Sequence, residues 1–370
     1  MKKILILAGR YLPGHKDGGP LRTLINISEA LGDEYDIHIA CWDRDQGDTQ
    51  PYPDVKVGEW NQVGKAKVFY VEQGGFTDEL LLSLIEGKDV VYLCSFYDEY
   101  GYKTLLLNKR NKISCKVALA SMGVFSESAL AQKALKKKVF ITLCKILGVF
   151  KDVVWSVTSE LEAEDVKRVI GNNINYVVAE DLPRTTVPGL MDKPQGPMKI
   201  AFLSRICEHK NPMVVIDAVS RMKNKNVELT LFGPIQEPEY WNECLKKLKN
   251  SDIRWKYEGD VPSDDVQKVL SQQDVLVLPT KSENYGHVVF EAMSVGCVPI
   301  ISDRTPWAVV EEKKAGYVLP LDTAMFAKAL DDFYELTEEE KHKMALCGVE
   351  LAKDKVRQSK EQTGYRTIFG

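Results

Sequence analysis

The sequence predicts an α/β protein built from two parallel-sheet domains in tandem, and three observations carry this prediction. The chain has 370 residues, more than one hydrophobic core usually organises. Short apolar runs rich in β-branched residues alternate with helical patterns from end to end, as in parallel sheets wrapped by helices. Near the middle, this alternation stops in LPRTTVPGLMDKPQGPM, where prolines and glycines disfavour regular structure.

In the first half, seven apolar runs predict strands, and the polar and amphipathic segments between them predict helices. One helix has a clear start, because Ser159 followed by Glu162 forms a capping box before ELEAEDVKRVI. The predicted strands are residues 3–8, 37–41, 68–71, 90–93, 116–120, 153–157 and 174–179.

The alternation restarts after residue 198 and ends in a long helical tail at about residues 323–355. The predicted strands here are residues 199–203, 228–232, 253–257, 275–278 and 298–301, and the predicted helices are residues 212–222, 240–249 and 263–270. We therefore expect a Rossmann-like domain at residues 1–183, a linker at 184–198, a second Rossmann-like domain at 199–352 and a tail at 353–370 that returns to the first domain.

Composition excludes several classes of protein. With 44% hydrophobic and 28% charged residues, the chain is typical of a soluble globular protein. A net charge of -4 provides no global basic field, so we expect no nucleic-acid partner. The eight cysteines form no CxxC pair and predict reduced core thiols in a cytoplasmic protein, and the scattered histidines argue against a zinc site. No apolar run is long enough to span a membrane.

The segment SENYGHVVFEAMSVGCVPIISD contains the most informative pattern in the sequence. Glu283 precedes a glycine-bearing turn, and Glu291 interrupts an apolar run in which a carboxylate needs hydrogen-bond partners. A helix that begins near Gly286 would present the backbone N–H groups of Gly286, His287 and Val288 to an anion such as a diphosphate. Glu291 would lie about 6 Å further along the axis, where it suits the hydroxyls of a ribose.

Two further loops follow the first strand of each predicted domain. In FLSRICEHKNP, two basic residues suit the binding of a diphosphate, Arg205 through its planar guanidinium and Lys210 through its point charge. The alternative is that both are solvated loop residues. In AGRYLPGHKDGGPLRTL, Gly18 and Gly19 precede a helix that starts at Pro20. Two glycines allow a ligand to approach the backbone closely, and the alternative is that they only form a turn. The pattern is not GxGxxG, so an NAD site is disfavoured.

Together, the E-x7-E spacing, the Arg205 and Lys210 pair and the Gly18-Gly19 loop resemble the retaining glycosyltransferases of family 4. The resemblance implies a GT-B fold, with two Rossmann-like domains facing each other across a cleft and a C-terminal helix that crosses back. It implies transfer of a hexose or N-acetylhexosamine from a nucleotide sugar, for which family frequency favours UDP, to a saccharide or lipid-linked saccharide acceptor in surface polysaccharide synthesis. Neither a cofactor nor a metal is expected.

The resemblance also implies roles for individual residues. Glu283, Arg205 and Lys210 would act at the reacting sugar and the leaving diphosphate, and Glu291 would hold the ribose. The remaining donor-binding residues would be Gly18, Gly19, Gly233, Asn284, Tyr285, Gly286, His287 and Val288.

The acceptor loop departs from the family pattern. Many relatives have a histidine or arginine before a glycine there, whereas this chain reads ASMGVFSESAL, with Met122 before Gly123. The acceptor-side candidates are therefore Met122, Ser126 and Glu127.

The segment ALAQKALKKKVFITLCKILGVFKD predicts a basic amphipathic helix between Lys133 and Lys151. Such a helix can lie on the anionic inner leaflet of the cytoplasmic membrane, and the alternative is that its apolar face packs on its own sheet. The apolar stripe consists of Leu135, Val139, Leu143, Ile146 and Phe150.

Two other functions stay open from the sequence. The chain could be a noncatalytic nucleotide-sugar-binding subunit of a partner enzyme, or a GT-B epimerase of nucleotide sugars. Turnover by the purified chain would exclude the first, and product analysis without acceptor would reveal the second.

Overall fold

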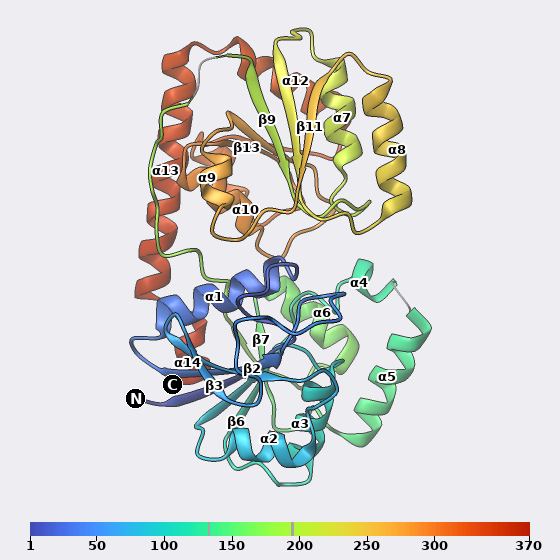
Figure 1. Ribbon diagram of the computed structural model, residues 1–370, viewed down its shortest axis with the longest axis vertical. Coiled ribbons are helices and arrows are strands. Elements are labelled where there is room, and N and C mark those ends of the chain that lie inside the picture. Colours follow the sequence, from blue (N-terminus) through green and yellow to red (C-terminus); the bar gives the residue numbers. More distant parts are fainter. Residues whose placement is uncertain (132–133, 194–195) are drawn as a thin grey trace. The chain divides into compact units, whose positions relative to one another are not determined.

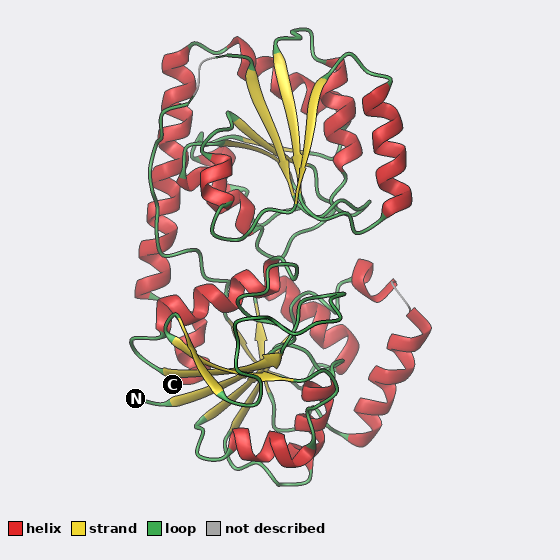
Figure 2. Cartoon of the chain, viewed as in Figure 1, coloured by secondary structure: helices red, strands yellow, loops and turns green. Residues whose placement is uncertain are grey.

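The computed structural model describes residues 1–131, 134–193 and 196–370. The chain divides into two compact units, each built on its own parallel sheet with helices on both faces (Figures 1 and 2). The N-terminal unit comprises Met1–Leu182 and Ser359–Gly370, and the C-terminal unit comprises Pro183–Gln358. The predicted class, two parallel α/β sheets in tandem, is confirmed.

The N-terminal sheet has eight strands in the order β3-β4-β2-β1-β5-β6-β7-β8, and only the β3–β4 pair is antiparallel. All seven predicted strands are present. The additional strand, β3, lies at the edge of the sheet and was not predicted because its four residues WNQV include only two apolar ones, and none of the four is buried. The bounds are β1 Lys3–Leu7, β2 Asp36–Trp42, β3 Trp60–Val63, β4 Ala66–Val71, β5 Val90–Leu93, β6 Lys116–Ala120, β7 Val154–Val157 and β8 Asn175–Val178.

Helices cover both faces of this sheet because its strands are apolar on both sides. Along β1, Ile4 and Ile6 belong to the core on one face, whereas Leu5 and Leu7 belong to the core on the other. The helices are α1 Gly19–Leu31, α2 Asp78–Ile85, α3 Glu99–Lys109, α4 Glu127–Ala131, α5 Ala134–Leu147, α6 Glu160–Ile170 and α14 Gly364–Phe369.

The C-terminal sheet has six parallel strands in the order β11-β10-β9-β12-β13-β14. Its strands are β9 Met198–Leu203, β10 Val227–Phe232, β11 Arg254–Gly259, β12 Val275–Leu278, β13 Val298–Ser302 and the unpredicted three-residue β14 Tyr317–Leu319. Its helices are α7 Pro212–Arg221, α8 Pro238–Lys249, α9 Val266–Leu270, α10 His287–Ser294, α11 Val309–Glu312, α12 Thr323–Glu335 and α13 Glu338–Glu361.

The strand order of the C-terminal sheet reverses between β9 and β12. From β9 the chain builds outward to β10 and β11, and it then returns to the other side of β9 and continues through β12, β13 and β14. Open α/β sheets bind ligands at the carboxyl ends of the two strands that flank such a reversal. The loops that follow β9 and β12 are therefore the first place to look for a site.

The C-terminal tail is two helices and not the single long helix that its pattern predicted. Thr337 interrupts the helix after α12 and starts α13 with a capping box, in which Glu340 accepts from the Thr337 N–H (2.8 Å) and the Glu340 N–H donates to Thr337 Oγ1 (3.3 Å). After Ser359 the chain belongs to the N-terminal unit. There α14 buries Tyr365, Ile368 and Phe369 in the core beneath β1 and β5.

Candidate active site

Two loops of the C-terminal unit meet where the strand order reverses. One follows β9 and spans residues 204–211, and the other follows β12 and spans residues 279–286. The Lys281 N–H donates to the carbonyl of His209 (2.9 Å), and His209 Nε2 lies 3.1 Å from the carbonyl of Ser282. Burial lowers the pKa of His209, with a further contribution from the neighbouring Lys210, so this imidazole is neutral at pH 7.

Lys210 and Glu283 form an ion pair between these two loops. Lys210 Nζ lies 2.5 Å from Glu283 Oε1, and the side chains are only 10% and 15% exposed. A second pair, Lys281 with Glu208 at 2.6 Å, joins the same loops at the surface, where the side chains are 45% and 69% exposed. The buried pair is the stronger interaction because it is less screened by water. It holds an ammonium and a carboxylate side by side at the carboxyl edge of the sheet.

The loop after β12 leads directly into α10, and Gly286 makes the turn. Gly286 has φ 79° and ψ 57°, a left-handed conformation that side-chain-bearing residues rarely adopt. The indole N–H of Trp307 donates to the carbonyl of Tyr285, which fixes the residue before the turn. No side chain caps α10 within the described part of the chain. The helix therefore begins at His287, as predicted, with the positive end of its dipole directed at this loop.

Glu291 lies on the buried side of α10 and is 4% exposed. The guanidinium of Arg184 compensates its charge, with Arg184 Nε 3.5 Å from Glu291 Oε1. Arg184 is itself held by a hydrogen bond to the carbonyl of Ser263 (2.7 Å). Sequence reasoning expected a partner for this carboxylate but missed Arg184, because a single arginine in a proline-rich linker carries no recognisable signal.

Arg205 has different surroundings from Lys210, although the two share a loop. Its side chain is exposed and donates to Gln236 Oε1 (2.9 Å). The loop after β10 pairs with this loop through a bridge between Ile206 and Ile235. At Gly233, φ is 124° and an added Cβ would lie 2.0 Å from the carbonyl oxygen of Ser204. The close approach of the two backbones therefore explains why residue 233 is a glycine, and no ligand is needed to explain it.

The other predicted donor-binding residues lie around the start of α10. Tyr285 and Gly286 are buried, His287 and Val288 are half-buried, and Asn284 is exposed. The rings of Tyr285 and His287 are 4.7 Å apart, and Tyr285 also packs edge-on against Trp307. The structure thus brings Lys210, Glu283 and the α10 start together, and it places Glu291 deeper on the same helix.

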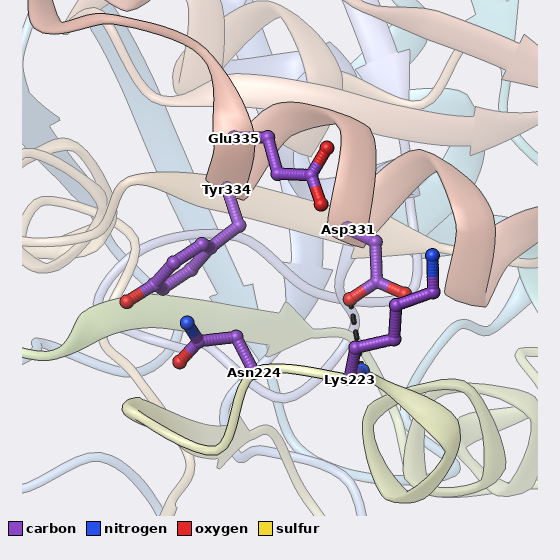
Figure 3. Close-up of a pocket in the computed structure, with 5 residues that line it drawn as sticks. All are labelled: Lys223, Asn224, Asp331, Tyr334 and Glu335. Atoms are coloured by element: carbon purple, nitrogen blue, oxygen red, sulfur yellow. Dashed lines mark hydrogen bonds between the residues drawn. The ribbon is translucent and has the colours of Figure 1, made fainter.

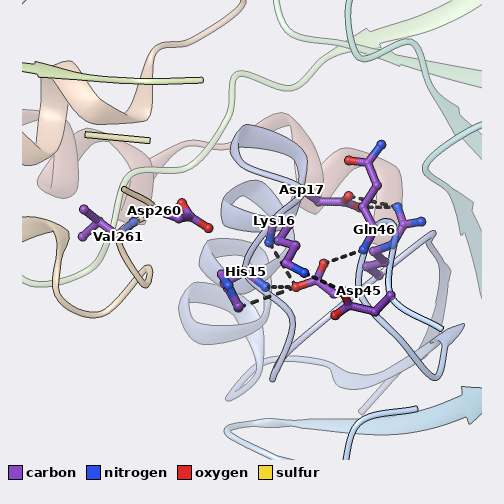
Figure 4. Close-up of polar contacts among 9 residues, drawn as sticks. His15, Lys16, Asp17, Asp45, Gln46, Asp260 and Val261 are labelled. Carbon is purple, nitrogen blue, oxygen red and sulfur yellow. Dashed lines mark hydrogen bonds and ion pairs between the residues drawn. The ribbon is translucent and has the colours of Figure 1, made fainter. Parts of the chain in front are cut away.

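In the N-terminal unit, the Gly18-Gly19 loop precedes α1 and presents open backbone. Both glycines are exposed, and an added Cβ would meet no atom within 4 Å. The buried carboxylate of Asp45 anchors the start of this loop by accepting from the N–H groups of His15 (2.8 Å) and Lys16 (3.2 Å) (Figure 4). Arg10 holds Asp17 at 2.9 Å. Sequence reasoning missed Asp45, which lies in the separate loop after β2.

The predicted acceptor loop follows β6 in the N-terminal unit. Met122 is half-buried with φ 44°, and the N–H of Gly123 donates to Glu162. The Glu162 N–H donates to Ser159 Oγ, which is one half of the predicted capping box, and the Glu162 carboxylate also accepts from the N–H of Thr158, one residue before the cap. Ser126 Oγ donates to the carbonyl of Gly123 (3.0 Å). Glu127 starts α4, and its side chain lies outside the described part of the structure.

A pocket of about 460 Å³ lies elsewhere in the C-terminal unit, between α12 and the turn after α7 (Figure 3). The N–H of Lys223 donates to Asp331 Oδ1 (3.0 Å) across it. Because α7 ends at the amino edge of the sheet, this pocket lies away from the loops after β9 and β12. Its lining residues are Lys223, Asn224, Asp331, Tyr334 and Glu335.

The described residues contain neither a metal cluster nor a membrane-spanning helix. Among residues 1–131, 134–193 and 196–370, no group of three or more His, Cys, Asp or Glu side chains could hold a metal ion. Within the same ranges, no helix has both the length and the apolar character needed to cross a membrane.

The C-terminal half of the chain is similar to known glycosyltransferases. The family described as glycosyl transferases group 1 matches residues 190–345. The chain is 26% identical over 166 residues to a D-inositol 3-phosphate glycosyltransferase of Corynebacterium efficiens, an alignment that covers 42% of this chain and 38% of the relative. It is 25% identical over 191 residues to an uncharacterized glycosyltransferase of Methanocaldococcus jannaschii, covering 49% and 47%. The chain thus matches less than half the length of these relatives.

Solved structures resemble the whole chain. A sucrose-phosphate synthase from Thermosynechococcus elongatus superimposes with a TM-score of 0.75 at 16% identity, covering 100% of this chain and 99% of that one. HepE of Anabaena in complex with UDP-glucose superimposes with a TM-score of 0.73 at 14% identity, covering 100% and 99%. The likeness establishes the GT-B fold, with two Rossmann-like sheets and a long C-terminal helix.

The two ion pairs that join the loops after β9 and β12 give a matched test of burial. Glu283→Gln leaves the buried ammonium of Lys210 without a charged partner, and we expect it to lower the free energy of unfolding by about 3 kcal/mol. Glu208→Gln breaks the exposed pair with Lys281 and should lower it by less than about 1 kcal/mol. Urea unfolding measures both values, and equal losses would contradict the structural role assigned to the buried pair.

Proposed function

We propose that this protein is a retaining glycosyltransferase. It transfers a hexose or N-acetylhexosamine from a UDP-linked donor to a saccharide or lipid-linked saccharide acceptor. The match of residues 190–345 to the group 1 glycosyl transferases supports the reaction class. The likeness to HepE, whose structure holds UDP-glucose, is the reason to name UDP first, although the fold alone does not select the base.

The observation that carries the proposal is the arrangement of Lys210, Glu283 and Glu291 about the start of α10. Lys210 and Glu283 lie 2.5 Å apart beside the loop into which the helix dipole points. A diphosphate suits the backbone N–H groups of Gly286 to Val288 together with the Lys210 ammonium. The Glu283 carboxylate, on the same loop, suits the hydroxyls of a sugar.

Glu291 supplies the second carboxylate, about one helical turn further along α10. A ribose joined to a diphosphate at the helix start reaches this depth, where Glu291 lies opposite the guanidinium of Arg184. Since the two hydroxyls of a ribose are donors, an ionised carboxylate is the appropriate partner.

Arg205 is assigned to the leaving diphosphate. Its side chain lies on the loop after β9, is exposed, and donates a hydrogen bond to Gln236. An exposed guanidinium can bind the charge that builds up on the leaving group, and such stabilisation is commonly a large term in catalysis. Roles for Gly18, Gly19 and Gly233 in donor binding, and for Met122, Ser126 and Glu127 in acceptor binding, stay predictions.

We place the reaction in the cytoplasm, in surface polysaccharide synthesis, with a peripheral position at the inner face of the membrane. This part of the proposal rests on the proposed saccharide or lipid-linked acceptor and on the basic helix α5 of the N-terminal unit. The nature of the acceptor is to be found by assay, because the side chains of the acceptor loop do not select one.

The ribose contact is tested by a thermodynamic cycle. We expect wild type to bind UDP about 10- to 100-fold more tightly than 2′,3′-dideoxy-UDP, because the latter lacks both hydroxyls that donate to a charged acceptor. In Glu291→Gln this preference should fall to a few-fold, with little change in affinity for the dideoxy compound. Isothermal titration calorimetry measures all four affinities. A preference that survives in the variant would remove Glu291 from the ribose site.

The role of Arg205 is tested by turnover. Arg205→Ala should lower kcat about 100-fold or more, with a much smaller change in donor affinity. Arg254→Ala is the matched control, because Arg254 is also exposed and also bonds an amide oxygen, that of Asn226 (2.8 Å), but lies at the amino end of β11. The readout is release of UDP by the purified chain from a panel of UDP-sugars, with and without saccharide acceptors.

The same assay separates the alternatives. Transfer with retained anomeric configuration, seen by NMR of the product, supports the proposal. Nucleotide binding without any turnover would indicate a noncatalytic binding subunit. Conversion of the donor to an epimer without acceptor would indicate an epimerase.

A further inference from the structure

Helix α5 exposes a stripe of large apolar side chains. Leu135 and Ile146 are 77% and 76% exposed, Val139 and Leu143 are each 52% exposed, and Leu147 is 55% exposed. At 3.6 residues per turn, these five side chains fall within an arc of about 120° on one face of the helix. The alternative raised by the sequence, that this stripe packs on its own sheet, is therefore wrong for these residues, although Phe150 is half-buried against Trp155.

The opposite face of α5 attaches the helix to the N-terminal unit. Ile141 and Cys144 are buried in the core, and Phe140 packs among the rings of Tyr97 and Tyr102. The helix is thus fixed in orientation, and its exposed stripe is not the result of a missing core contact. Figure 1 shows α5 at the outer side of the N-terminal unit.

The polar positions of α5 are basic. Its sequence, ALKKKVFITLCKIL, contains four lysines and no acidic residue. Lys138 and Lys145 are exposed and lie on the same side of the apolar stripe, where the Lys145 ammonium donates to the carbonyl of Val169 (2.7 Å). Exposed Lys136 falls within the arc of the stripe, close to Leu147. Lys151 follows the helix and is exposed as well. Lys133 lies outside the described residues.

We propose that α5 is the surface by which this protein docks on an anionic lipid bilayer. The helix lies in the plane of the interface, with Leu135, Val139, Leu143, Ile146 and Leu147 inserted among the acyl chains. Lys138 and Lys145 bind the phosphate groups of anionic lipids beside the inserted stripe. An apolar face bordered by lysines is the arrangement that binds such interfaces, through buried apolar area and electrostatic attraction together.

A second copy of the chain is the less favourable occupant. Two α5 helices packed through their stripes would bring two sets of lysines together with no carboxylate on either helix to neutralise them. The stripe is also small: a helix of this length measures about 21 Å by about 10 Å, or about 200 Å². Stable dimers bury about 800 Å² on each partner. Charge and area therefore both favour the lipid surface.

The inference does not depend on glycosyl transfer, so binding alone tests it. Vesicles of phosphatidylcholine and vesicles with added phosphatidylglycerol are floated with the full-length protein. Wild type should float with the anionic vesicles and less with the neutral ones, and added salt should release it. Lys138→Gln/Lys145→Gln should weaken binding to the anionic vesicles about 25-fold, at about fivefold for each lysine. Leu135→Ser/Ile146→Ser should weaken it about 100-fold.

The matched control is Lys246→Gln/Lys249→Gln, which removes two exposed lysines from the last turn of α8. It changes the net charge equally and should float like wild type. Circular dichroism melting shows whether each variant is folded. Equal flotation of the α5 variants and wild type, or no flotation of wild type, would overturn the proposal. Self-association of wild type that is lost in Leu135→Ser/Ile146→Ser, without vesicle binding, would identify a second copy as the occupant and overturn it as well.

Discussion

The candidate site depends on the ion pair between Lys210 and Glu283. These residues are 73 positions apart, yet the sheet brings them together because β9 and β12 are neighbours in parallel register. The pair joins the loops that leave the carboxyl ends of both strands, and the hydrogen bond from Lys281 to the His209 carbonyl joins them again. If these loops separated, the Lys210 ammonium would no longer lie beside the loop that leads into α10.

The second constraint is the start of α10 itself. Gly286 permits the left-handed turn, Trp307 holds the residue before it, and the chain then runs directly into a helix whose buried face carries Glu291. A carboxylate at this depth is tolerated because Arg184 lies opposite. The linker before β9 therefore contributes a side chain to the interior of the unit that it precedes. Affinity for a diphosphate and for a ribose would thus arise from one short helix, with Lys210 beside the loop that leads into it and Arg184 opposite Glu291.

The sequence was informative where local chemistry determines the structure. The glycine before an apolar run containing Glu291 predicted both the start of α10 and a buried carboxylate, and the alternation of apolar runs predicted the parallel sheets. Partners distant in sequence could not be predicted. Arg184, Asp45 and the pairing of Lys210 with Glu283 follow from the order of strands, which the period of a strand or helix does not encode.

The helix α5 shows the same limit. Its pattern of lysines and apolar residues predicted an amphipathic helix, but the face that packs on the core is a narrow one formed by Phe140, Ile141 and Cys144. The wide apolar stripe faces outward, and a period of 3.6 residues cannot tell which of two apolar faces is buried. Similarly, β3 has only two apolar residues in WNQV, and β14 is an apolar run of only three residues, so neither shows the longer apolar run by which strands are recognised.

A crystal structure of the protein with UDP bound is the most direct test of this account. We expect the diphosphate against the backbone N–H groups of Gly286 to Val288, with the Lys210 ammonium in contact and both ribose hydroxyls on the Glu291 carboxylate. UDP bound elsewhere, or bound here with its ribose away from Glu291, would contradict the central claim.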